Sequence, residues 1–299
     1  MSSIPHLVQY QGSKRNLAGK ILDYIPNKCD RIIEPFAGTA AITMACATHH
    51  IADKYIINDL NKPLIELLNL VVNEPKYVSS AYTKTWNGQT ADSISHYYKV
   101  REEFNQTKDP VLFLYLLARC VKGAVRYNSE GMFNQSPDKR RRGTAPKTME
   151  KNIHSISYIL KGKIDFYSED YKILLQKTQP GDIVYMDPPY QGVCGDRDSR
   201  YFAGISHCEF VEELRNLHNR GISFIVSYDG KLGKKSYGKE LPKDIGLEHV
   251  FLNAGRSSQA TLLGKKDETI ESLYVTRDLI EVVEKIEKEN QNELFERVS

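Results

Sequence analysis

Short apolar runs bounded by turn-forming residues recur along most of the chain, separated by amphipathic stretches. Such runs are typical of strands buried on both faces of a mostly parallel sheet. They predict strands at 31–34, 55–59, 163–167, 183–186 and 221–227. The amphipathic stretches predict helices at 17–25, 41–47 and 210–219, and one capped by Asn61 with a buried stripe at Leu64, Leu67, Leu68 and Val71. This alternation indicates an α/β fold.

The strand at 183–186 ends abruptly at Asp187, Pro188, Pro189 and Tyr190. Prolines cannot donate ladder hydrogen bonds, so Asp187 stands at the carboxyl end of the strand, the edge of an α/β sheet where ligands bind. A carboxylate, the Pro188 carbonyl and the flat face of Tyr190 together suit a planar amino group attached to a flat ring. Taken alone, the four residues fit an ordinary Asp-Pro-Pro turn equally well.

Three further loops carry candidate binding residues. Gly38, after the strand at 31–34, lets the backbone approach a ligand closely, but a single glycine does not make the dinucleotide pattern G-x-G-x-x-G. Asp59 ends the next strand, the position from which nucleotide-binding folds hold ribose hydroxyls; as a lone acid it fits a turn or cap role equally well. A Gly/Ser turn carrying Lys14 opens the first helix and can hold a small anion or simply be solvated.

The strand and helix alternation stops between residues 73 and 162. The segment contains a predicted buried helix at 110–125 and then a loop-rich stretch in which aromatic residues lie among cations, ending in the run Lys139 to Arg142. Residues 119–151 hold nine Lys and Arg against three Asp and Glu, a net charge of +6, whereas the whole chain carries only +3. This pattern is typical of a nucleic-acid contact surface, although a charge run is also often just a solvated face.

The alternation resumes after residue 162 and continues to a predicted hairpin. The polar stretch 191–204 contains three glycines and is expected to close over a substrate. Residues 206–209 match a helix capping box. The runs 249–252 and 272–276 predict paired strands with a polar crown at 255–259 between them, and the tail from Leu279 predicts an amphipathic helix that serves packing.

Composition excludes several classes of protein. The five cysteines are scattered and the eight histidines lack metal-ligand spacing, so neither a disulfide framework nor a metal site is expected. No apolar run reaches the length of a membrane helix, and the amino terminus lacks a signal-peptide pattern, so we expect a cytoplasmic protein.

Five short motifs, in order along the chain, resemble the DNA adenine methylase family, the α-group of site-specific N6-adenine DNA methyltransferases that use S-adenosylmethionine. They are Tyr10-x-Gly12-x-Lys14, Glu34-Pro-Phe36-x-Gly38, Asn58-Asp59-x-Asn61, Arg126-Tyr-Asn128-x-x-Gly131-x-Phe133-Asn134 and Asp187-Pro-Pro-Tyr190. The family often has a second glycine where Ala40 stands here. We expect a backbone φ below zero at Ala40, with a slightly altered loop and retained cofactor binding.

The resemblance implies a class I S-adenosylmethionine-dependent, Rossmann-like fold: a mixed sheet with helices on both faces and an inserted, mostly helical target-recognition domain. Residues 1–75 and 161–299 would form the catalytic domain and 76–160 the inserted DNA-binding domain. The residues implied to contact the cofactor are Tyr10, Gly12, Lys14, Glu34, Phe36, Gly38, Asp59, Asp170 and Asp187. Those implied in catalysis are Asp187, Pro188, Pro189 and Tyr190, the last stacking on a flipped-out adenine.

The resemblance also implies contacts with double-stranded DNA by Arg126, Asn128, Asn134, Lys139, Arg140, Arg141 and Arg142. Such enzymes act on chromosomal DNA in the cytoplasm of bacteria or phage-infected cells, and a cognate restriction endonuclease is a possible partner. The alternatives left open are methylation of cytosine N4, of RNA adenine or of a glutamine amide, and a non-catalytic nucleic-acid-binding module. A dehydrogenase fits less well, because the loop has a single glycine.

Overall fold

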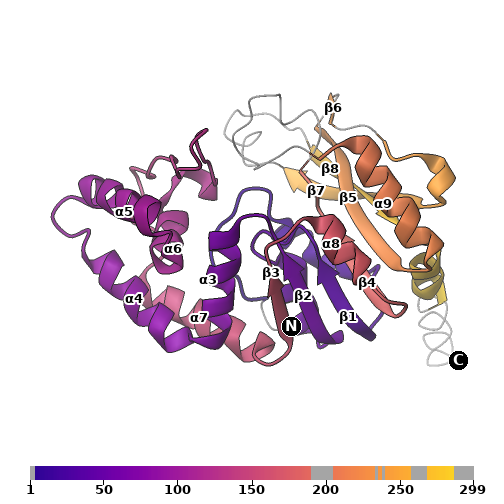
Figure 1. Ribbon diagram of the computed structural model, residues 1–299, viewed down its shortest axis with the longest axis horizontal. Coiled ribbons are helices and arrows are strands. Elements are labelled where there is room, and N and C mark those ends of the chain that lie inside the picture. The colour runs from indigo at the N-terminus through magenta and orange to yellow at the C-terminus, as the bar shows by residue number, and fades with distance from the viewer. Residues whose placement is uncertain (1–3, 190–204, 233–234, 238–239, 257–267, 286–299) are drawn as a thin grey trace, which may run out of the picture.

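The computed structural model describes residues 4–189, 205–232, 235–237, 240–256 and 268–285. A mixed sheet lies at the centre, with helices on both of its faces and a helical lobe beyond one edge (Figure 1). This arrangement confirms the predicted α/β fold with a mixed sheet. Within the described residues, no helix combines the length and the apolar character needed to cross a membrane.

The sheet has the strand order β3-β2-β1-β4-β5-β8-β7, with β6 paired to β5. Its strands are β1 Cys29–Glu34, β2 Ala52–Asn58, β3 Ile164–Tyr167, β4 Asp182–Met186, β5 Ser223–Leu232, β6 Lys235–Tyr237, β7 Glu248–Arg256 and β8 Glu268–Val275. The strands β1 to β5 are parallel, whereas β8 pairs antiparallel with β5 and β7. All five strands predicted from apolar runs are present, as is the predicted hairpin.

Alternate residues of the central strands enter two separate hydrophobic clusters. On β4, Ile183 and Tyr185 pack with the helices of one face, while Val184 and Met186 pack with those of the other. The first face is covered by α1 Ala18–Leu22, α2 Ala41–Thr48, α3 Lys62–Asn73 and α7 Pro146–Leu160, and the second by α8 Tyr171–Gln176 and α9 His207–Asn219. Burial on both faces explains why these strands are apolar at consecutive positions rather than at every second one.

The inserted segment forms the lobe next to α3 (Figure 1). It contains α4 Pro75–Asn87, α5 Ser93–Thr107, α6 Pro110–Arg119 and α7. Its aromatic residues Phe104, Phe113 and Phe133 are buried against one another and belong to the same cluster as α3. The lobe therefore shares one continuous core with that face of the sheet.

Several element boundaries differ from the predictions. The helix predicted at 110–125 ends at Arg119, because Cys120 is extended and Lys122 has a φ of 60°. The strand predicted at 221–227 continues to Leu232, because β8 pairs with it across a bulge between Ser227 and Gly230. The polar crown at 255–259 begins as part of β7, and 257–259 lie outside the described residues, as do the stretch 191–204 and the tail from 286.

The expectation that Ala40 has a negative φ was wrong. Ala40 has φ 56° and ψ 46° and is fully buried. The turn from β1 into α2 requires this left-handed residue, because the Ala40 amide donates to the Ala37 carbonyl while the Ala40 carbonyl accepts the first helical bond from Met44. A left-handed alanine costs roughly 1–2 kcal/mol, which packing of the loop must offset.

Ala40→Gly should therefore be better tolerated than Ala45→Gly, the matched change inside α2. Both lose a fully buried methyl group, but only the change at Ala40 relieves backbone strain. We expect Ala45→Gly to lower the free energy of unfolding by about 1–2 kcal/mol more than Ala40→Gly, as measured by urea denaturation. Equal losses at the two positions would show that Ala40 carries no strain.

Candidate active site

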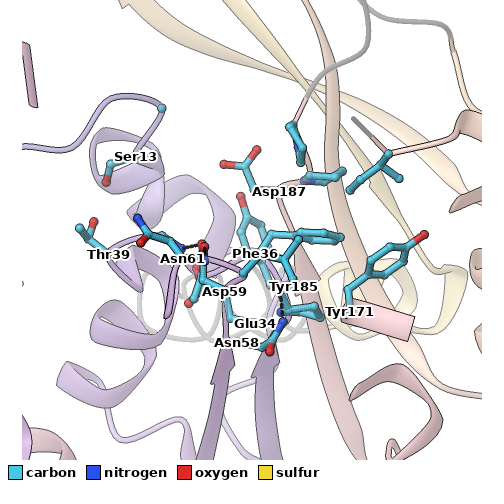
Figure 2. A pocket seen from close by; sticks show the side chains of 18 of the residues that line it. Ser13, Glu34, Phe36, Thr39, Asn58, Asp59, Asn61, Tyr171, Tyr185 and Asp187 are labelled. Carbon is cyan, nitrogen blue, oxygen red and sulfur yellow. Dashed lines mark hydrogen bonds between the residues drawn. The ribbon is translucent and has the colours of Figure 1, made fainter. Parts of the chain in front are cut away.

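A cavity of about 260 Å³ opens at the carboxyl ends of the parallel strands. The chain proceeds from β1 to β2 and β3 on one side of the sheet and from β4 to β5 on the other, so β1 and β4 flank the point where the strand order reverses. Loops leave such a point in opposite directions and open a crevice between them. In Figure 2, Asp187 stands on one side of this cavity and Asp59 with Asn61 on the other, while the Phe36 side chain extends towards Tyr171.

The side chain of Asn58 holds three of the loops that form the cavity. Its Nδ2 donates to the Pro35 carbonyl and to the Glu169 carbonyl, at 3.0 Å each, and its Oδ1 accepts from the Glu169 amide at 2.9 Å. Asn58 is 1% exposed, so these bonds have little competition from water. The ends of β1, β2 and β3 are thereby fixed relative to one another.

Asp59 is held by two backbone amides. Its Oδ2 accepts from Gly38 at 2.9 Å and its Oδ1 from Asn61 at 2.8 Å. Burial raises the pKa of Asp59, while these two bonds act in the opposite direction. Asp59 thus fulfils the turn role that was left open for it and also faces the cavity.

Asn61 occupies the N-cap position of α3, but its side chain makes no capping hydrogen bond. Its Oδ1 accepts instead from the Tyr127 hydroxyl at 3.0 Å. Tyr127 and Val125 line the cavity although both belong to the insertion. Sequence reasoning missed Tyr127; the available signal was its place between Arg126 and Asn128 in the fourth motif.

Lys14 lies between two carboxylates. Its Nζ is 3.0 Å from Asp187 Oδ1 and 3.5 Å from Glu271 Oε2, and its side chain is 8% exposed. The turn that carries Lys14 is fixed to the insertion, because the Gln11 amide donates to the Gly123 carbonyl at 3.0 Å. Lys14 therefore contacts Asp187 directly, and Glu271 joins the site without having been predicted.

Glu34 lies deeper, at 3% exposure. Its Oε2 accepts from the Thr43 amide at 3.0 Å and from the Thr43 hydroxyl at 2.7 Å. Burial raises the pKa of the Glu34 carboxyl to about 7; the bonds from Thr43 lower it and the charge of Asp187 raises it further. Glu34 therefore links the start of α2 to the floor of the cavity.

Aromatic rings form part of the cavity wall. Phe36 packs on Tyr171 with ring centroids 5.0 Å apart, and Phe210 continues the row to a stacked Tyr228 at 5.4 Å. Phe36 and Tyr171 face the cavity. This wall offers flat apolar surface for a ring.

The cavity gathers most of the residues predicted for the cofactor and for catalysis. Its lining includes Tyr10, Gly12, Lys14, Glu34, Phe36, Gly38, Asp59, Asp170, Asp187, Pro188 and Pro189. Asp170 also caps α8, accepting from the Lys172 amide at 2.9 Å. Tyr190 lies outside the described residues.

The residues predicted for DNA contact lie on the insertion, away from the cavity lining. Asn128 closes its own turn, with Oδ1 accepting from the Glu130 and Met132 amides at 3.0 and 2.9 Å. The Asn134 amide donates to the Arg126 carbonyl at 3.0 Å. These contacts make the segment a folded turn rather than a loose loop.

The backbone of the basic run at 139–142 is held in place by hydrogen bonds from a buried arginine and to a neighbouring aspartate. The buried Arg119 donates to the carbonyls of Asp138 and Arg141. Asp138 in turn accepts from the Arg140 amide and the Arg141 guanidinium, at 2.9 Å each. The side chains of Arg140 and Arg141 are nevertheless 90% and 62% exposed, so a fixed backbone presents them to solvent.

Comparison with known proteins gives a family match over most of the chain. Residues 10–257 match the model of the D12 class N6 adenine-specific DNA methyltransferases. The Type II methyltransferase M1.LlaDCHI of Lactococcus lactis subsp. cremoris is 25% identical over 284 residues, which cover 89% of this chain and 94% of the relative. A DNA adenine methylase of Salmonella typhi is 27% identical over 277 residues, covering 89% and 94%. The retron Ec67 DNA adenine methylase of Escherichia coli is 29% identical over 264 residues, covering 85% and 88%.

Glu34→Gln should remove a component of the pH dependence of stability. The folded state holds the Glu34 proton up to about pH 7, whereas an unfolded glutamate releases it near 4.5, so the contribution is present below 4.5 and lost as the pH rises through about 7. Across this window, we expect the free energy of unfolding of the wild type to fall by about 3 kcal/mol relative to Glu34→Gln.

Denaturant unfolding at a series of pH values measures this difference. Thr43→Val provides a second variant: it removes the hydroxyl that lowers the Glu34 pKa, so the loss of stability should extend to higher pH. Parallel pH curves for the wild type and Glu34→Gln would contradict the assignment.

Proposed function

The chain belongs to the D12 class of N6 adenine-specific DNA methyltransferases, and from this premise we propose that it transfers the methyl group of S-adenosylmethionine to N6 of an adenine flipped out of double-stranded DNA. The observation that carries the proposal is the position of Asp187 and Pro188. Both lie at the end of β4 and line the cavity at the point where the strand order reverses.

The electrostatics of the cavity favour a cationic ligand. Among the described residues, its lining holds five acids, Glu34, Asp59, Asp170, Asp187 and Glu209, against two lysines, Lys14 and Lys172. A dinucleotide or another phosphate-bearing ligand would meet repulsion there, whereas a ligand with an ammonium and a sulfonium group would be attracted. S-adenosylmethionine, when bound, supplies a methyl group on a sulfonium, which an amine can take up directly.

The proposed cofactor contacts are made by residues that line the cavity. Asp59, fixed by two backbone amides, would hold the ribose hydroxyls, and Tyr10, Gly12 and Asp170 would add further contacts with the cofactor. Glu34, Phe36 and Gly38 would line its methionine end. Lys14 would contribute through its ion pair with Asp187.

The proposed catalytic role of Asp187 rests on the chemistry of an exocyclic amine. The amino nitrogen of adenine is a poor nucleophile, because its lone pair is delocalised into the ring. If Asp187 and the Pro188 carbonyl each accept one N–H bond, the nitrogen becomes tetrahedral and its lone pair points into the cavity. The acceleration then comes from positioning and from preorganised acceptors rather than from a strong base.

The amino group of a paired adenine lies inside the duplex, so the base must leave the stack to reach Asp187. We propose that Tyr190 stacks on the extruded base. In this proposal, residues 76–160 form the target-recognition domain, carrying Arg126, Asn128, Asn134 and the run at 139–142, and residues 1–75 and 161–299 form the catalytic domain. The net charge of +6 on residues 119–151 supports a polyanionic partner.

We further propose that this protein is the modification enzyme of a restriction-modification system and that a cognate endonuclease is its partner. One relative is named a Type II methyltransferase, which supports this role, while others are named DNA adenine methylase. Digestion of DNA from cells expressing the protein would test it: resistance to an endonuclease encoded beside the gene supports the role, and sensitivity overturns it.

Incubation with tritiated S-adenosylmethionine and duplex DNA, followed by nucleoside analysis, tests the reaction and the substrate together. Label in N6-methyldeoxyadenosine supports the proposal. Label in N4-methyldeoxycytidine, or transfer to RNA alone, would replace it by one of the alternatives.

Asp187→Ala should lower kcat by about 10³-fold or more, because it removes an acceptor that acts on the reacting nitrogen. Duplex binding, measured by fluorescence anisotropy, should stay within a few fold of the wild type. Asp53→Ala is the matched control, an exposed acid on β2 towards the opposite edge of the sheet, and should leave both values unchanged. Near-normal turnover by Asp187→Ala would refute the catalytic assignment.

The triple variant Arg140→Gln, Arg141→Gln and Arg142→Gln should weaken binding to all duplex sequences. The slope of log affinity against log salt should become shallower by about 1 for each DNA phosphate that the variant no longer neutralises. The control carries Lys28→Gln, Lys54→Gln and Arg277→Gln, which remove the same charge from the edge of the sheet opposite the cavity. An unchanged slope in the first variant would identify the basic run as a solvated face.

A further inference from the structure

The buried ammonium of Lys14 is shared by two carboxylates that come from two different parts of the chain. Asp187 follows β4, while Glu271 lies on β8, near the carboxyl end of the chain. The distances from Lys14 Nζ are 3.0 Å to Asp187 Oδ1 and 3.5 Å to Glu271 Oε2, and the two acidic side chains are 19% and 18% exposed. We call these three residues the Lys14 cluster.

The antiparallel direction of β8 is what brings Glu271 to this edge. Residues early in β8 pair with residues late in β5, and Glu271 lies opposite Gly230, beyond the bulge at Ser227. Every second side chain of a strand lies on the same face of the sheet, so Glu271 shares its face with Leu273 and Val275. Both of these belong to the core on the face that the amino-terminal segment covers. Glu271 therefore projects towards that segment, where Lys14 begins the short helix η1 Lys14–Asn16.

The formal charge of the Lys14 cluster determines how well Asp187 can act. A buried lysine paired with Asp187 alone would neutralise it, and the carboxylate would then be a weaker acceptor for the N–H bonds of an amine. With Glu271 also paired to Lys14, the cluster keeps one net negative charge. This negative charge stabilises, by electrostatic attraction, the positive charge that develops on an amine nitrogen as it gains a methyl group.

We propose that Glu271 is a positioning residue for methyl transfer, holding Lys14 so that Asp187 stays oriented and the cluster stays negative. The inference rests on the proposed catalytic role of Asp187. Glu271 acts through Lys14 and need not touch either substrate. A purely structural tether between β8 and the amino-terminal turn is the competing explanation.

Charge and shape can be separated at this position. Glu271→Gln keeps the shape and removes the charge, whereas Glu271→Asp keeps the charge and shortens the side chain. We expect kcat, at saturating S-adenosylmethionine and duplex DNA, to fall about 10- to 100-fold in Glu271→Gln and less than about 10-fold in Glu271→Asp. KM for DNA and the urea unfolding midpoint should stay close to wild type in both variants.

A double-mutant cycle tests whether Glu271 acts through Lys14. In a Lys14→Met background, adding Glu271→Gln should change kcat less than about twofold, because the ammonium that Glu271 holds is gone. Glu248→Gln, an exposed glutamate at the start of β7 towards the opposite edge of the sheet, is the matched control and should retain wild-type kcat.

Several outcomes would overturn the inference. One is a wild-type kcat in Glu271→Gln; another is a loss in Glu271→Gln that is confined to KM or to stability; a third is an equal loss with and without Lys14. If the wild type forms no labelled N6-methyldeoxyadenosine, the proposed function fails and the inference fails with it. If the wild type is active and Asp187→Ala is not, a wild-type kcat in Glu271→Gln contradicts only the role proposed for Glu271 and leaves the proposed function standing.

Discussion

The buried amide of Asn58 sets the geometry on which the whole site depends. Its two donated bonds and one accepted bond join the loops after β1, β2 and β3 into one unit. A buried amide left without partners is costly, so the loops cannot separate without losing these bonds. Together with the bond from the Gly38 amide to Asp59, this side chain fixes the positions of Phe36, Asp59 and Asp170 relative to one another.

The molecule presents two regions of opposite electrostatic character. In the part of the chain that the structure describes, five acids and two lysines line the cavity, whereas residues 119–151 carry a net charge of +6. Under the proposed function, the acidic cavity binds a cationic methyl donor, and residues 119–151 contact the DNA phosphates. The separation matters physically, because a phosphate drawn into the cavity would compete for Lys14 and would be repelled by Asp187.

The lobe and the cavity are nevertheless connected by specific bonds. Tyr127, from the insertion, donates to Asn61, whose backbone amide donates to Asp59. The Gly123 carbonyl accepts from Gln11 in the turn that carries Lys14. The lobe also continues the hydrophobic core of α3. The insertion is thus part of the wall of the site as well as a separate surface.

The amino-acid sequence by itself determined the strands, their burial and the position of Asp187, because these depend on local properties: consecutive apolar residues, and prolines that cannot extend a ladder. Short motifs likewise indicated many of the residues that line the cavity. Only the tertiary structure decided the positive φ of Ala40, the bond from Tyr127 to Asn61, the extension of β5 and the pairing of Lys14 with Glu271. The last three join segments distant in the chain, and no local pattern specifies which distant partner a side chain or strand edge will meet. The φ of Ala40 is set by the tight turn that connects β1 to the buried helix α2.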